Sequence, residues 1–315
     1  MIPPFDWQRV VVAPWTDGLP TYGWVVLMGF LVALACGLIG NFLVLRRMAL
    51  VGDAISHSIL PGIAVAFLLS KSRGTIVMFS GALVAGLVTT VLIEFIHRRT
   101  RVKQDAAIGI VFSTLFAFGV LLISMFAGQV DLDADCVLYG ELGLVGMEPY
   151  AMIGGVEIAP QPVLTMGIVC LLVVALIFFF YKELLVSSFD PALATSLGMR
   201  PGVVHHALMA ALSVVVVGAF RAVGAILVIA MLILPGATAY LLVSRLPRML
   251  LLSVIHAALS AVAGLHLGVW LDCSIGAAMV VAGAALFTLA WLRVLLGRRL
   301  VGSPPEPEGT SMIGG

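Results

Sequence analysis

An aspartate and a histidine stand four residues apart in an otherwise apolar stretch of this chain. The local sequence reads Gly52-Asp53-Ala54-Ile55-Ser56-His57. Residues four apart lie on one face of an α-helix, with about 5–6 Å between their Cβ atoms. A carboxylate oxygen and an imidazole nitrogen together suit divalent ions such as Mn²⁺, Zn²⁺ or Fe²⁺. Asp53 and His57 are therefore the main candidate metal ligands; the structural alternatives are a helix N-cap and a hydrogen-bonded core group.

Other polar residues in apolar stretches are weaker candidates for metal contact. His256 and His266 are ten residues apart in one stretch, so on a helix they diverge by about 80°. They could line different levels of one pathway, although hydrogen-bonded core groups are the simpler interpretation. Four further residues near the expected helix ends are expected to reach water: Glu94, His97, His205 and His206.

The composition of the chain indicates the class of fold that must position these residues. Of 315 residues, 62% are hydrophobic and only 10% are charged, whereas soluble domains carry about 25% charged residues. This excludes a soluble fold and predicts an all-α polytopic protein surrounded by membrane lipid, because helices satisfy their own backbone hydrogen bonds. A net charge of +1 without a basic cluster argues against a nucleic-acid partner. The four cysteines lack metal-ligand spacing, and whether Cys136 and Cys273 pair is open.

Nine apolar stretches approach the roughly 20 residues needed to cross a bilayer, although a count of eight is also compatible with the sequence. They cover residues 24–45, 54–70, 75–96, 106–127, 163–181, 203–220, 222–243, 249–271 and 274–292. Only Arg221 separates the sixth from the seventh, so a tight turn is expected there. We expect an extracytoplasmic N-terminal segment (1–23), a transmembrane domain (24–296) and a disordered cytoplasmic tail (297–315).

The distribution of basic residues predicts the orientation, because cytoplasmic loops retain Lys and Arg. Nine crossings with the N-terminus outside place 13 of the 17 Lys and Arg residues inside. The C-terminus is then inside as well. The acidic residues of the loop 131–157 fall outside, where they would either attract cations or be an ordinary solvated loop.

One short pattern occurs twice, as Ile59-Leu60-Pro61-Gly62 and as Ile233-Leu234-Pro235-Gly236. Proline removes a helical hydrogen bond, and broken helices in a membrane are tolerated where they line a cavity or are buried in protein. In the nine-span topology the two helices run in opposite directions. Paired interruptions of this kind predict a transport pathway at an inverted repeat. Asp53 and His57 stand next to the first.

The sequence contains no nucleotide-binding Gly-x-x-x-x-Gly-Lys-Ser/Thr loop and no His-Glu-x-x-His protease motif. We therefore expect a transport protein and not an enzyme. Its energy source would be an ion gradient or an ATPase on a separate subunit.

Three runs resemble signatures of the manganese/zinc/iron ABC-transporter permeases, the ABC-3 family. They are residues 40–62, 188–198 and 224–239, and the resemblance covers about residues 24–296 in order. It implies the permease subunit of an ATP-driven divalent-metal importer in the plasma (inner) membrane of a bacterium. The implied partners are a cytoplasmic ATPase, a second copy or a sister permease, and an extracytoplasmic metal-binding protein. The metal, which is Mn²⁺, Zn²⁺ or Fe²⁺, is the transported substrate, and no permanently bound cofactor is implied.

The resemblance also implies that a short coupling helix between the fifth and sixth spans docks on the ATPase. Its residues are Phe189, Asp190, Pro191, Ala194 and Gly198. From the residues alone, Pro191 fits the first position of a helix, and a plain connector is the alternative. Two other functions remain open: a vitamin B12/siderophore-type ABC permease, against which the Asp53/His57 pair argues, and an ATP-independent secondary metal transporter or channel.

Overall fold

The computed structural model describes residues 3–71, 74–125, 142–153 and 156–301. Cys136, the acidic residues at 131–141 and the tail from 302 onward lie outside these ranges. The long helices are α2 (Leu19–Leu45), α3 (Leu50–Ser70), α4 (Thr75–Arg99), α5 (Gln104–Met125), α7 (Gln161–Phe179), α10 (Pro201–Leu242), α11 (Leu246–Leu271) and α12 (Ile275–Val301). The short helices are η1 (Gln8–Val12), α1 (Ala13–Thr16), η2 (Leu142–Met147), α8 (Tyr181–Phe189) and α9 (Pro191–Ser196).

These helices confirm the prediction of an all-α polytopic membrane protein. Eight helices in the described ranges are long and apolar enough to cross a membrane, and Leu227–Leu242 is a shorter apolar helix. The sequence did not predict the small antiparallel hairpin of β1 (Tyr150–Ile153) and β2 (Val156–Pro160), in which Tyr150 lies opposite Pro160.

Helix α10 contains a break at Gly224, where φ is 74° and ψ is 170°. This backbone conformation is essentially restricted to glycine. The turn between the sixth and seventh stretches therefore lies at Gly224 and not at Arg221, where it was expected. Other boundaries also differ: α2 already begins at Leu19, and α12 continues through 297 to Val301.

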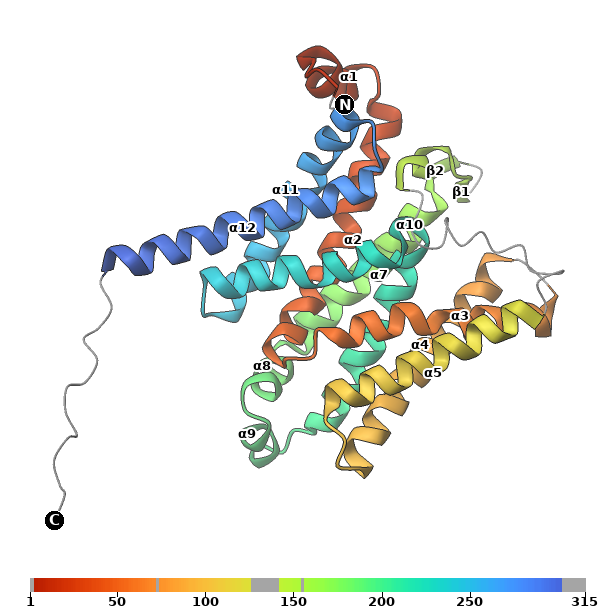
Figure 1. The fold of residues 1–315 in the computed structure, drawn as a ribbon, viewed down its shortest axis with the longest axis vertical. Coiled ribbons are helices and arrows are strands. Elements are labelled where there is room, and N and C mark those ends of the chain that lie inside the picture. The colour runs from red at the N-terminus through yellow and green to blue at the C-terminus, as the bar shows by residue number, and fades with distance from the viewer. Residues whose placement is uncertain (1–2, 72–73, 126–141, 154–155, 302–315) are drawn as a thin grey trace.

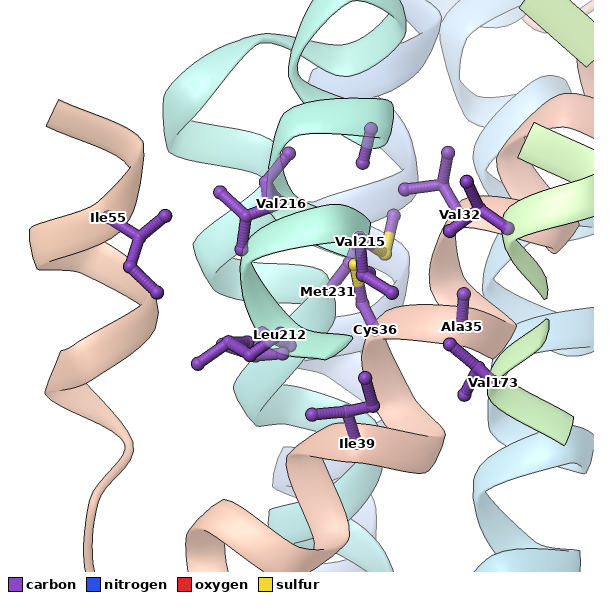
Figure 2. Packing of buried hydrophobic residues seen from close by; sticks show 14 of the residues in the cluster. Val32, Ala35, Cys36, Ile39, Ile55, Val173, Leu212, Val215, Val216 and Met231 are labelled. Carbon is purple, nitrogen blue, oxygen red and sulfur yellow. The ribbon is translucent and has the colours of Figure 1, made fainter. Parts of the chain in front are cut away.

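The core lies at the centre of the bundle, where α2 packs against α10, α11 and α7. Figure 2 shows Val32, Cys36 and Ile39 of α2 beside apolar residues of α7 and α10. Helix α2 is the most enclosed of the candidate spans, because 72% of its most apolar window is buried. Helix α3 packs against α4 and α5, which also contact each other, on the other side of the molecule (Figure 1).

Neither Pro61-Gly62 nor Pro235-Gly236 interrupts its helix, contrary to the expected breaks. The glycines instead allow two helices to touch. A Cβ atom on Gly62 would collide with the carbonyl oxygen of Gly81, and one on Gly81 would collide with that of Gly62. Helices α3 and α4 therefore meet backbone to backbone.

The two prolines make related contacts with glycines of neighbouring helices. A Cβ atom on Gly119 would lie 2.8 Å from Cδ of Pro61, and one on Gly37 would lie 2.9 Å from Cβ of Pro235. Each proline thus packs on a glycine of a neighbouring helix. Both copies of the repeated pattern serve close packing, with no loss of helical structure.

Candidate functional site

Asp53 and His57 lie on one face of α3, as their spacing predicted. His57 Nε2 is 3.3 Å from Asp53 Oδ1, and 27% and 39% of the two side chains, respectively, are exposed. The N-cap of α3 is Ala49, so the interpretation of Asp53 as an N-cap is wrong. The pair is an accessible carboxylate and imidazole, which is the chemistry that a divalent transition metal requires.

Two aromatic residues of α5 hold the imidazole ring of His57. The ring centroid of Phe112 is 5.2 Å away and that of Phe116 is 5.9 Å away. These contacts restrict the ring while its Nε2 atom faces the carboxylate. Next to Asp53, Gly52 gives room for Leu232 of α10.

The pair provides two ligands and not a complete coordination shell. Among the described residues, no group of three or more His, Cys, Asp or Glu side chains could hold a metal ion. Water or a second polypeptide would have to supply the remaining ligands. An incomplete shell suits a transport site, because conduction requires binding weak enough for the ion to leave.

The two weaker candidates, His256 and His266, make structural hydrogen bonds. His266 Nδ1 is 2.8 Å from the carbonyl oxygen of Val10, and its Nε2 accepts a hydrogen bond from Trp15 Nε1 at 3.2 Å. Both ring nitrogens are thus engaged by the N-terminal segment. His256 is buried, and its Nε2 is 3.2 Å from the carbonyl oxygen of Gly283. These contacts favour the interpretation of both residues as hydrogen-bonded structural groups.

The predicted coupling segment forms the short helix α9 at the edge of the bundle (Figure 1). Asp190 is its N-cap and accepts a hydrogen bond from the Leu193 backbone N–H at 2.9 Å. Pro191 occupies the first turn and Ala194 is fully buried. At the C-terminal end, Gly198 has φ 78°, a left-handed conformation that favours glycine. The local sequence therefore specifies both ends of α9.

Three apolar side chains of this segment point away from the protein. Phe189, Leu193 and Leu197 are 56%, 48% and 59% exposed. Apolar side chains that gather outside the spanning helices indicate a surface for a protein partner. The segment therefore presents apolar side chains that are free to contact another protein.

A polar network next to α9 was missed from the sequence. Arg46, the residue after α2, donates hydrogen bonds to Ser188 Oγ at 3.0 Å and Ser187 Oγ at 2.9 Å. Burial lowers the pKa of its guanidinium group, although arginine stays charged in proteins. A third arm, Nη1, lies 3.4 Å from His205 Nδ1.

The network continues to Glu94, which was expected to reach water but is mostly buried. The Glu94 side chain is only 13% exposed, and its Oε2 is 2.9 Å from His206 Nε2. Its Oε1 is 2.5 Å from Arg98 Nη2 and 3.8 Å from His205 Nε2. A cavity of about 280 Å³ adjoins the group and is lined by Glu94, His97, His205 and others. Spacing within α4 pairs Glu94 only with Arg98. It could not have joined Glu94 to the histidines of α10, or Arg46 to the serines of α8, because these residues lie on separate elements.

The fold and these sites together define a polytopic membrane permease. The model of the ABC 3 transport family matches residues 19–294, and the chain belongs to this family. It is 44% identical over 269 residues to the manganese transport system membrane protein MntD of Bacillus subtilis, covering 85% of this chain and 90% of that protein. It is 43% identical over 268 residues to the zinc transport system membrane protein TroD of Treponema pallidum, covering 85% and 72%.

A solved structure has the same fold. The chain resembles PsaBC from Streptococcus pneumoniae in complex with Fab, with a TM-score of 0.73 and 33% identity. The likeness covers 89% of this chain and 95% of that one. The fold and the family therefore agree with the resemblance in the sequence.

Proposed function

We propose that this chain is the membrane permease subunit of an ATP-driven importer of a divalent transition metal. Manganese and zinc are the first candidates, because the similar proteins carry those metals in their names. The observation that carries the proposal is the Asp53/His57 pair, two accessible metal-ligating side chains 3.3 Å apart within a membrane-spanning helix. Ionisable groups in such helices are costly and mark substrate pathways.

The chain would work in a larger assembly. A cytoplasmic ATPase would dock on α9, whose exposed Phe189, Leu193 and Leu197 suit a protein interface. A second permease copy or a sister permease would complete the pathway and supply the ligands that Asp53 and His57 lack. An extracytoplasmic binding protein would deliver the metal to the outer face, with the N-terminus outside and the C-terminus inside.

In this function the metal passes from the outer face to Asp53 and His57, which bind it through one oxygen and one nitrogen. The carboxylate offsets the positive charge that is costly in the bilayer. The aromatic residues Phe112 and Phe116 keep the imidazole in place. ATP binding and hydrolysis in the partner would then alternate the access of this pair between the two sides.

Reconstitution tests the proposed function. The chain is co-expressed with its ATPase, purified as a complex and placed in liposomes. Entry of radioactive Mn²⁺, Zn²⁺ and Fe²⁺ is then measured with and without ATP. We expect uptake of at least one metal that requires both ATP and the ATPase.

The rival functions predict different results in the same assay. Metal uptake by the chain alone, without the ATPase, would show a secondary transporter or channel. Uptake of a metal chelate in preference to the free ion would indicate a siderophore-type permease. Either result would contradict the proposed function.

A further inference from the structure

The side chain of Arg46 joins two segments that are far apart in the sequence. Its Nε and Nη2 atoms donate to Ser188 and Ser187 of α8 at 3.0 and 2.9 Å. Hydrogen bonds to a charged group stabilise more than those between neutral groups. Arg46 is partly buried between these partners, so its guanidinium group is held in one position.

One end of this link leads to the candidate docking helix. Ser188 is followed by Phe189, Asp190 and α9, whose first residue is Pro191. A displacement of α9 would be passed to α8, and it would move the two serines of α8 that Arg46 holds. In Figure 1, α8 and α9 follow one another at the edge of the bundle.

The other end leads to the candidate metal pair. Arg46 is the C-cap of α2, and the chain reverses at once through Arg47, whose φ is 58°. The Met48 N–H donates to the carbonyl oxygen of Leu43 at 2.9 Å and closes this turn. Helix α3 then begins at Leu50 and carries Asp53 in its first turn.

His205 extends the link to a third helix. Arginine has only hydrogen-bond donors, so the His205 Nδ1 atom that faces Arg46 at 3.4 Å must be the acceptor. The proton of the neutral ring is then on Nε2, which faces Glu94 Oε1 of α4 at 3.8 Å. Arg46 is thus connected to α8 directly and to α4 through His205.

We infer that Arg46 is a positioning residue that ties the coupling segment α8–α9 to the turn from which the Asp53/His57 helix starts, and that it transmits ATPase movement to the metal pathway. This inference rests on the proposed function. It assigns to Arg46 no contact with the metal or with ATP. Loss of the Arg46 side chain should therefore leave the binding of metal and of ATP intact, while ATP hydrolysis no longer drives transport efficiently.

The test measures metal ions transported per ATP hydrolysed in the reconstituted complex. Arg46→Gln should lower this ratio by about tenfold, within the range typical of coupling between two sites, while the complex still assembles and hydrolyses ATP. Arg46→Lys should recover part of the ratio, because lysine keeps the charge but loses the fork geometry that engages two serines. The matched control is Arg47→Gln, which removes the same charge from the adjacent, exposed residue and should leave the ratio unchanged.

Two results would overturn the inference. One is a wild-type ratio in Arg46→Gln, and the other is an equal decrease in Arg46→Gln and Arg47→Gln. If Arg46→Gln does not assemble, the double variant Ser187→Ala/Ser188→Ala decides, because it removes the acceptors and retains the arginine; an unchanged ratio there overturns the inference. Failure of the proposed function looks different, since the wild-type complex would then show no ATP-dependent metal uptake.

Discussion

Asp53 and His57 are close enough to interact with each other, and this has a consequence for metal binding. Their atoms Oδ1 and Nε2 are 3.3 Å apart, so an incoming ion must compete with that contact. The aromatic neighbours Phe112 and Phe116 limit the movement of the ring. The two side chains are therefore arranged before the metal arrives, and their weak mutual contact is readily exchanged for metal coordination.

Replacing either residue should impair uptake while leaving assembly intact. We expect Asp53→Asn and His57→Ala each to lower the uptake rate about tenfold or more, because loss of one charged contact costs about 1.5–3 kcal/mol. The measurement is ATP-dependent uptake by purified complexes in liposomes. Asp105→Asn, the same change at an exposed carboxylate in the first turn of α5, serves as the control. Wild-type uptake in both site variants would remove the pair from the mechanism.

The sequence predicted this pair because its geometry is local. A spacing of four residues determines which side chains share a helical face. The Arg46 network depends instead on four elements that fold together, so its members appear in the sequence as unrelated polar residues. For the same reason Glu94 and His205 were expected to reach water, although the structure pairs them.

At the scale of elements, the repeated Pro-Gly pattern has a different effect from the one predicted, because it packs helices together and does not break them. The repeated Pro-Gly pattern was expected to break two helices. Proline can nevertheless remain inside a helix when the surrounding helices pack closely around it. Pro61 lies inside α3, and Gly62 and Gly81 permit direct contact between α3 and α4. The break in α10 occurs at Gly224, because φ 74° with ψ 170° excludes other residues.

A pair of glycine substitutions tests this role in packing. Gly62→Ala should destabilise the protein by about 1–3 kcal/mol, because overpacking against backbone cannot be relieved by a rotamer change. Gly109→Ala in α5 is the control, since a Cβ atom there meets nothing within 4 Å. It should be neutral or stabilising by up to about 1 kcal/mol, because alanine favours helix more than glycine does.

Thermal unfolding of the two variants in the same detergent distinguishes these expectations. The Tm of Gly62→Ala should fall below that of the wild type, and the Tm of Gly109→Ala should not. Equal Tm values for the two variants would contradict the close contact between α3 and α4.

At the scale of the whole molecule, composition was sufficient to predict the class of fold. The apolar stretches identified every long helix in the part of the chain that the structure describes, because a membrane leaves few alternatives for the backbone. Their ends were less predictable: α2 begins at Leu19 and α12 reaches Val301, since a helix can continue beyond the apolar layer. The hairpin of β1 and β2 was missed because it is a small element outside the apolar stretches.

The orientation remains a prediction and can be measured by cysteine labelling. Cys273 is exposed and follows α11 on the predicted outer side. A variant that retains only this cysteine should react with a membrane-impermeant maleimide in cells whose plasma membrane is intact and whose outer layers have been made permeable to the reagent. A cysteine-free variant carrying Arg101→Cys, at an exposed position on the predicted inner side, should react only after the membrane is permeabilised. The reverse pattern would contradict the topology.

The contact between Gly62 and Gly81 limits how the molecule can change shape. Side chains at an interface can slide by changing rotamers, but two backbones in contact leave no adjustable layer between them. Shear between α3 and α4 is therefore blocked where these glycines meet. Any alternation between outward and inward access must carry α3 and α4 as one rigid body, so that Asp53 and His57 move together with Glu94.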